Sequence, residues 1–150
     1  MSMTTSNRLL ISEVLQKVSN AKTKAEKIKL LQENNTQALR SILIWNYDES
    51  VVSLIPEGEV PYRPNEAPAG TEHTVLEKEA RKLYYFIKGG DATLKQFKRE
   101  QMFIQMLEGL HSSEAELLVL VKDKKLQDKY RITKAVVQEA FPQIKWGGRS

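Results

Sequence analysis

Apolar residues in the first part of the chain recur at the spacing of amphipathic helices. Over residues 8–20 they fall at i, i+3, i+4 and i+7, which places them on one face of a helix. Either Ser6 or Asn7 would cap the start of this helix. Thr23 stands three residues before a glutamate, the spacing of a capping box, and this predicts a second helix over residues 24–33.

The same pattern continues into a third segment. A third helix is expected to begin near Thr36 and to turn Leu39 and Leu43 inward, with Trp45 close to its end. Short polar connections join the three predicted helices. Because short connections favour antiparallel neighbours, the sequence predicts one compact helical unit over residues 6–47.

The pattern changes over residues 48–73. The stretch 51–55 is β-prone and predicts at most a minimal strand, and four prolines follow within 13 residues. Each proline removes a backbone donor and restrains the residue before it, so no helix is expected here. This proline-rich arm is predicted either to lie as a strap over the core through Ile55, Val60 and Tyr62, or to offer a surface to a partner.

Helical spacing returns after the arm. A helix that begins at Thr74 is expected to stop at the glycine pair 89–90, and another is expected over residues 93–110. The second of these has two adjacent apolar stripes, one of which includes Phe97. A helix with so wide an apolar surface is buried on two sides, so this segment is the candidate central helix.

Two further helices complete the expected set. Ser113 stands three residues before Glu116, which predicts a capped helix that turns polar at Lys122. The last helix is expected over residues 133–141, with a threonine as its cap and the following proline as its stop.

The predicted fold class is therefore all-α. We expect a single compact domain over residues 1–150, with about six or seven helices. The proline-rich arm lies between two helical halves, residues 6–47 and 74–146. A chain of 150 residues with 41% hydrophobic residues is long enough to bury one core.

Composition excludes several kinds of chemistry. The chain has no cysteine, so it has no disulfide, zinc knuckle, iron–sulfur cluster or cysteine nucleophile. Its longest apolar run, residues 117–121, is far shorter than the roughly 20 residues that cross a bilayer, and its first residues lack a secretory pattern. We expect no membrane association, no cofactor and a cytoplasmic location.

The net charge of +4 comes from one stretch. Residues 122–134 hold six cations and two anions, so the rest of the chain sums to zero. These cations either contact phosphates near the start of the last helix or form a solvated face without a ligand. The candidate nucleic-acid or anion contacts are Lys122, Lys124, Lys125, Lys129, Arg131 and Lys134.

Aromatic residues beside irregular chain are candidates for contact with a protein partner. Trp45 and Tyr62 flank irregular segments, and Tyr85 is expected to be the exposed member of the consecutive aromatics 84–86. Such residues bring a large contact area at little entropic cost. The alternative is that they are half-buried and hold the arm to the core.

The sequence offers few candidates for catalysis. His73 and His111 could each act as a general base near neutral pH. Neither has a second histidine or an acid at ligand spacing, so no metal site is expected. The glycine pair after Lys88 lacks the strand and the Gly-Lys-Ser/Thr ending of a phosphate-binding loop. We assign no catalytic residue and expect that the protein is not an enzyme.

Several unusual segments resemble one known group of proteins. They are LIPEGEVPYRPNEAP at 54–68, EARKL at 79–83 with FIKG at 86–89, KRE at 98–100 with FIQMLE at 103–108, and IT at 132–133 with EAFP at 139–142. In them the chain resembles an uncharacterised family of small proteins from T-even-type tailed bacteriophages of cyanobacteria and other marine bacteria. The resemblance covers nearly the whole chain. It implies a phage protein in the cytoplasm of an infected bacterium, and it implies no reaction.

These observations favour a non-enzymatic phage accessory protein that binds a macromolecular partner. The partner is either replication or transcription machinery or nucleic acid. One alternative is a small structural component of the virion head or neck. The other is an enzyme that depends on His73 or His111.

Overall fold

The computed structural model describes residues 9–65 and 74–149. Within these ranges the chain forms seven α-helices and two 3-10 helices and has no strand, which confirms the predicted all-α fold. The elements, in chain order, are α1 (Ile11–Asn20), α2 (Lys24–Glu33), α3 (Gln37–Tyr47), α4 (Leu76–Glu79), η2 (Ala80–Phe86), α5 (Gln96–Gly109), α6 (Ser112–Lys122), η3 (Leu126–Asp128) and α7 (Lys134–Ala140).

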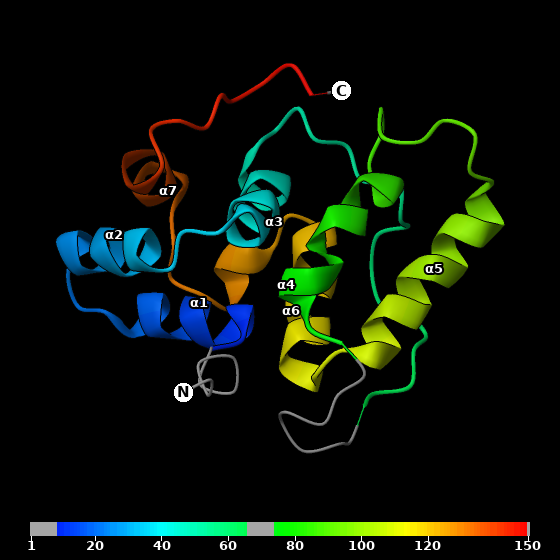
Figure 1. Ribbon diagram of the computed structural model, residues 1–150, viewed down its shortest axis with the longest axis horizontal. Helices are drawn as coiled ribbons and strands as arrows, with labels where there is room; N and C mark the ends of the chain where they lie inside the picture. Colours follow the sequence, from blue (N-terminus) through cyan, green and yellow to red (C-terminus); the bar gives the residue numbers. More distant parts are fainter. Residues whose placement is uncertain (1–8, 66–73, 150) are drawn as a thin grey trace, which may run out of the picture.

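Helices from both sides of the arm share one hydrophobic core. α1 packs against α2 and α6, and α7 packs against α2 (Figure 1). The predicted antiparallel unit of the first three helices is wrong for α3, which packs mainly against α6 and against α4 and η2. The apolar face of α3 is thus covered by elements from the second half of the chain, which short connections in the first half do not reveal.

The central helix is α6 and not α5, as the sequence predicted. Leu117, Leu118 and Val121 are fully buried, and α6 packs against α1, α3, α5 and η3. α5 lies at the edge of the molecule and packs against α6 and η2 (Figure 1). Phe97, in its first turn, is 75% exposed. The apolar stripe of α5 that includes Phe97 therefore meets no covering element at that end.

The segment predicted as one helix from Thr74 is a single α-turn followed by a 3-10 helix. α4 spans one turn, and η2 continues to Phe86. Side chains three positions apart lie above one another in a 3-10 helix, so Ala80, Leu83 and Phe86 form one buried stripe. Gly90 then passes so close to η2 that a Cβ there would lie 1.8 Å from the Tyr84 carbonyl oxygen.

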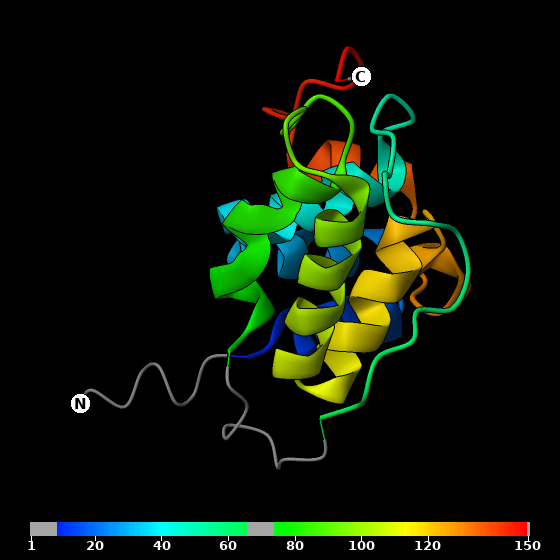
Figure 2. The same cartoon turned by 90° about the vertical axis from the view of Figure 1, so that its right-hand side faces the viewer.

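The arm lies as a strap on the helices, along the outer side of α6 (Figure 2). Ile55 is buried, and Val60 and Tyr62 pack half-buried against the core, so the arm lies over the core as predicted for a strap, while a partner surface on it stays a prediction. The minimal strand predicted over 51–55 is an isolated bridge between Ser53 and Ile87. One bridge leaves the arm dependent on side chains for the rest of its attachment.

Two side chains at the end of α6 hold the middle of the arm. Lys122 Nζ donates to the Gly58 carbonyl oxygen at 2.7 Å, and the Gly58 N–H donates to the Asp123 carboxylate at 3.1 Å. Gly58 has φ +100°, a conformation that L side chains rarely adopt. The glycine therefore lets both of its backbone groups face this pair.

Three helices begin at threonine caps, of which Thr23 and Thr133 were predicted as caps and Thr36 only as the approximate start of a helix. The hydroxyl oxygens of Thr23, Thr36 and Thr133 accept hydrogen bonds from backbone N–H groups at 3.1, 3.1 and 3.3 Å, respectively. The start of α1 differs, because it follows Leu10; Ser6 and Asn7 lie outside the described residues.

The starts of α5 and α6 were predicted at the wrong residues. In each case a nearby side chain accepts a hydrogen bond from the backbone N–H that precedes or begins the helix. His111 caps α6 by accepting from the Ser113 N–H at 3.1 Å, so Ser113 is not the cap. Asp91 accepts from the N–H and the hydroxyl of Thr93 at 2.9 and 2.6 Å and folds that residue into a turn. α5 consequently begins at Gln96.

The first turn of α6 also holds the starts of two other helices. Glu114 is 1% exposed and accepts from the Ile11 N–H of α1 and from the Leu76 N–H of α4, both at 2.9 Å. The Ser113 hydroxyl lies 2.8 Å from that of Ser12. Helix starts carry unpaired N–H donors and partial positive charge. One buried carboxylate therefore serves several helices.

We predict that Glu114→Ala destabilises the fold by about 3 kcal/mol, because it leaves two buried N–H donors without an acceptor. Denaturant unfolding monitored by circular dichroism measures the change. Glu116→Ala removes an exposed carboxylate from the same helix and is expected to cost less than about 1 kcal/mol. Equal losses for the two variants would contradict the assigned role of Glu114.

Candidate functional site

The structure places the six predicted cations in different environments. The Lys122 side chain is 0% exposed and forms an ion pair with Asp123 at 2.7 Å, besides its bond to the arm. As folded, it offers nothing to a nucleic acid. The role of Lys122 in the fold is to attach the arm to α6.

Lys124 is likewise committed to an internal contact. Its Nζ donates to the carbonyl oxygens of Trp45 and Asp48, at 2.6 and 2.8 Å, at the end of α3. Lys124 has φ +59°, and the N–H groups of Lys124 and Lys125 bond to carbonyls in the last turn of α6. This is the Schellman ending that normally uses glycine. Burial lowers the pKa of Lys124, although nearby acids oppose the shift.

The other four cations lie nearer the surface, and three of them have a partner within the fold. Lys125 lies 3.9 Å from Glu57, and Lys129 pairs with Glu116 at 3.1 Å. The ammonium of Lys134 lies 5.1 Å from the ring centroid of Trp146, and Arg131 is exposed. Contact of these residues with a nucleic acid stays a prediction.

The aromatic candidates are also separated. Trp45 is 3% exposed, so it offers no surface to a macromolecular partner in this fold. Tyr85 is half-buried, and the exposed member of the aromatic run is Tyr84, at 44%. The prediction for Tyr85 was wrong because η2 is a 3-10 helix. Tyr62 is half-buried on the arm.

Tyr62 and Lys129, predicted separately, line one groove between the arm and α6. The groove has a volume of about 530 Å³. Its floor is apolar and half-buried, and its rim is charged. The floor residues are Val60, Tyr62, Val119 and Leu120, and the rim residues are Glu59, Glu116, Asp128 and Lys129. We call this the arm groove.

Acidic groups dominate the electrostatics of the arm groove. Three carboxylates face one ammonium, and that ammonium is already paired with Glu116. Burial raises the pKa of Tyr62, and the charge of Glu116 adds to the effect. The hydrogen bond to Glu116 raises the pKa of Lys129, so this ammonium stays charged at neutral pH. The groove therefore favours a cationic ligand.

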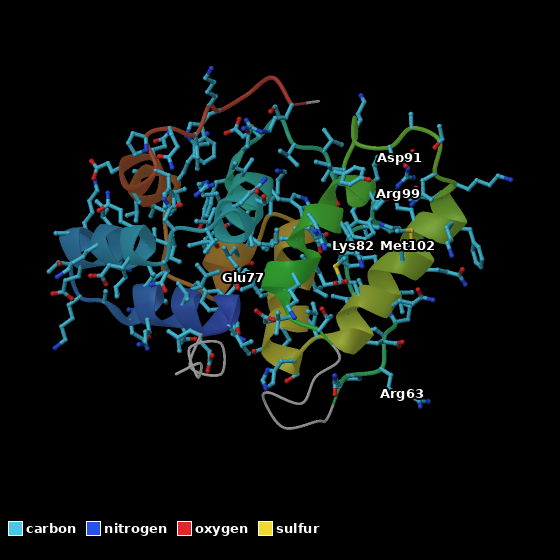
Figure 3. All side chains as sticks on the ribbon, in the orientation of Figure 1. Arg63, Glu77, Lys82, Asp91, Arg99 and Met102 are labelled. Atoms are coloured by element: carbon cyan, nitrogen blue, oxygen red, sulfur yellow. The ribbon has the colours of Figure 1, made fainter. Side chains whose placement is uncertain are left out.

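A second hollow, of about 510 Å³, lies between η2 and α5. Lys82 and Met102 project into the space between these two elements (Figure 3). At one end Arg99, beside Asp91 in Figure 3, donates to the Tyr85 and Asp91 carbonyls at 2.8 and 3.1 Å. This buried arginine fixes the loop before α5, so its charge is used inside the fold.

The histidines do not form a catalytic group in the part of the chain that is described. His111 caps α6, and its Nδ1 lies 2.8 Å from the Ser113 hydroxyl. His73 lies outside the described residues. Among the described residues, no three His, Asp or Glu side chains are grouped as metal ligands would be.

Sequence reasoning missed a further charged cluster, at Asp48. Its carboxylate accepts from the Ser50 N–H and hydroxyl at 2.8 and 2.7 Å, from the Gly147 N–H at 2.9 Å and from Arg149 at 2.7 Å. Burial alone would raise the pKa of Asp48. The hydrogen bonds from Gly147 and Ser50 and the charge of Arg149 outweigh burial and lower the pKa to about 2.

Comparison with known proteins identifies a family without an assigned function. The model of a family of unknown function, DUF6433, matches residues 14–128, and the chain belongs to this family. No curated protein and no solved structure matches the chain. In the described ranges, none of the helices is both long and apolar enough to cross a membrane.

We predict that Asp48 contributes about 2 kcal/mol of pH-dependent stability. Its pKa is about 2 in the fold against an ordinary 3.8. The contribution is complete above the ordinary pKa and is lost as the pH falls from about 4 to about 2. Urea unfolding across this range should show the stability of wild type approaching that of Asp48→Asn. A constant difference between the two would contradict the prediction.

We also predict that Lys124 and Lys125 differ in their effect on stability. Lys124→Met removes the donor to two carbonyls at the end of α3 and is expected to cost about 1–2 kcal/mol. Lys125→Met removes a neighbouring exposed ammonium and is expected to cost no more than about 0.5 kcal/mol. Thermal unfolding compares the two. Equal effects would show that Lys124 does not support α3.

Proposed function

We propose that this member of DUF6433 is a non-enzymatic protein whose arm groove binds a segment of a protein partner. The segment would present one apolar side chain flanked by lysine or arginine. The observation that carries the proposal is the pairing of a half-buried apolar floor with a rim of three carboxylates and one ammonium.

The floor supplies a place for an apolar side chain. Val60 and Tyr62 come from the arm, Val119 and Leu120 come from α6, and all four are half-buried. An apolar group that enters the groove removes further apolar surface from water. Tyr62 adds a large half-buried ring, and tyrosine is enriched among the residues that dominate interface energetics.

The rim sets the charge of the partner. Among the described residues, the side chains of Glu59 and Asp128 make no ion pair, so both carboxylates are available to a cation. Phosphate groups of a nucleic acid would meet these carboxylates and be repelled. The geometry therefore favours a basic protein segment over nucleic acid at this groove.

The wall that the arm provides is held in place before any partner binds. The arm is bonded to the end of α6 through Gly58, and the Arg63 N–H donates to Glu108 at 2.8 Å beyond the groove. A surface that is already ordered loses little conformational freedom on association. This fixed wall distinguishes the groove from a flexible loop.

The biological setting is part of the proposal. The resemblance of the arm and of residues 79–108 to proteins of T-even-type phages supports a phage accessory protein in the cytoplasm of an infected bacterium. Its partner would belong to the replication or transcription machinery. A virion component and a nucleic-acid-binding protein are the alternatives, and each predicts a different experimental outcome.

The groove can be tested with defined peptides on the ¹⁵N-labelled protein. An acetylated peptide of alternating lysine and leucine is expected to shift resonances of residues 59–62 and 116–129, while its glutamate counterpart is not. Glu59→Gln with Asp128→Asn should weaken binding of the lysine peptide about fivefold or more, because two charge-assisted contacts are lost. Glu33→Gln with Glu49→Gln removes two exposed carboxylates elsewhere and should leave binding unchanged.

Several outcomes would overturn the proposal. They are shifts that map outside the groove, equal binding by both peptides, and an equal effect of the two double variants. Salt-sensitive binding of duplex DNA that depends on Lys125, Arg131 and Lys134 would favour the nucleic-acid alternative. Co-sedimentation with purified virions, unaffected by the groove variants, would favour the virion alternative.

A further inference from the structure

A third hollow, the Trp45 cavity, lies between α3, η2 and the C-terminal segment and shares no lining residue with the other two. Its volume is about 320 Å³, near the lower limit for a small-molecule site. Most of its lining is apolar or aromatic. These wall residues are Ile44, Trp45, Val51, Leu83, Tyr84 and Ile87.

The 3-10 geometry of η2 gives this cavity one of its walls. Residues three apart lie above one another in such a helix, whereas in an α-helix they diverge around the axis. Arg81 and Tyr84 therefore share one stripe, and both line the cavity. In the continuous α-helix that the sequence pattern predicts, these two residues would share a face but would be offset from one another around the helix axis.

Trp45 lines the cavity and carries a polar group without a partner. The residue is 97% buried, since its exposure is 3%, and its indole Nε1–H makes no hydrogen bond to any residue that the structure describes. Buried indole N–H groups usually find an acceptor. The N–H is enclosed by the fold, so Trp45 lines the cavity through other atoms.

The charged residues that line the cavity are both arginines. Arg81 and Arg149 line it, and no carboxylate is among the lining residues described. Arg149 is paired with Asp48 at 2.7 Å. Arg81 is exposed and makes no ion pair or hydrogen bond within the described ranges, so its guanidinium is available to an anion.

We propose that this cavity binds a small organic carboxylate with an apolar body. The apolar body would lie among the aliphatic and aromatic walls. The carboxylate would pair with Arg81 at the opening. This site is independent of the arm groove, and its ligand differs in both size and sign of charge.

The test uses phenylacetate and phenylacetamide, two probes of the same shape that differ in charge. The chain has two tryptophans, so ¹H–¹⁵N spectra show two indole signals, and Trp146→Phe assigns them. Phenylacetate is expected to shift the Trp45 signal in a saturable way while the Trp146 signal stays in place. Phenylacetamide is expected to bind more weakly.

Arg81→Gln should weaken phenylacetate binding about tenfold and leave phenylacetamide binding unchanged, since one charge-assisted contact is lost. Lys88→Gln removes an exposed cation just beyond η2 that does not line the cavity, and should change neither affinity. Circular dichroism confirms that each variant is folded; if Arg81→Gln does not fold, Arg81→Lys, with its single point charge, takes its place. No saturable shift of the Trp45 signal, equal affinity for both probes, or equal effects of the Arg81 and Lys88 variants would overturn the proposal.

Discussion

The buried carboxylate of Glu114 is the contact on which the arrangement of the helices depends. It accepts the first N–H groups of α1 and α4, which come from opposite sides of the arm. The other end of α6 holds the end of α3 through Lys124 and the middle of the arm through Lys122. α6 thus fixes α3 before the arm, the arm itself and α4 after it. Desolvating these charges is costly, and it is offset because each faces donors or acceptors that would otherwise be unpaired.

This role of α6 changes the meaning of the cationic stretch. The sequence places the whole net charge of +4 in residues 122–134, as if it were one surface feature. The first two of its lysines are used in attaching neighbouring segments, and two others face Glu57 and Glu116. The concave surface beside this stretch is acidic. Net charge along a segment therefore says little about the potential at a site when long side chains can reach backbone carbonyls on other helices.

Local features were predictable from the sequence, and contacts between distant segments were not. The threonine caps of α2 and α7 were predicted because cap and helix lie within a few residues of each other. The turn in which Asp91 accepts from the Thr93 N–H is equally local, but it was not predicted. The central place of α6, the 3-10 form of η2 and the arm groove depend on which segments meet in space. Tyr62 and Lys129 were each predicted as contact residues. Their shared groove depends on the hydrogen bonds that hold Gly58 to the end of α6, and the periodicity of the sequence does not reveal these bonds.

The arm borders both the arm groove and the Trp45 cavity, and the way it is attached makes them separate sites. Val51 lines the cavity at one end, and residues 59–62 line the groove at the other. Between them the Leu54 N–H donates to Phe86, the Lys88 N–H donates to Val52, both at 2.8 Å, and Gly58 is clamped to α6. A displacement at one end would have to break these bonds before it reached the other. Changes at independent, well-separated sites add, so a ligand in the cavity should leave the affinity of the groove unchanged.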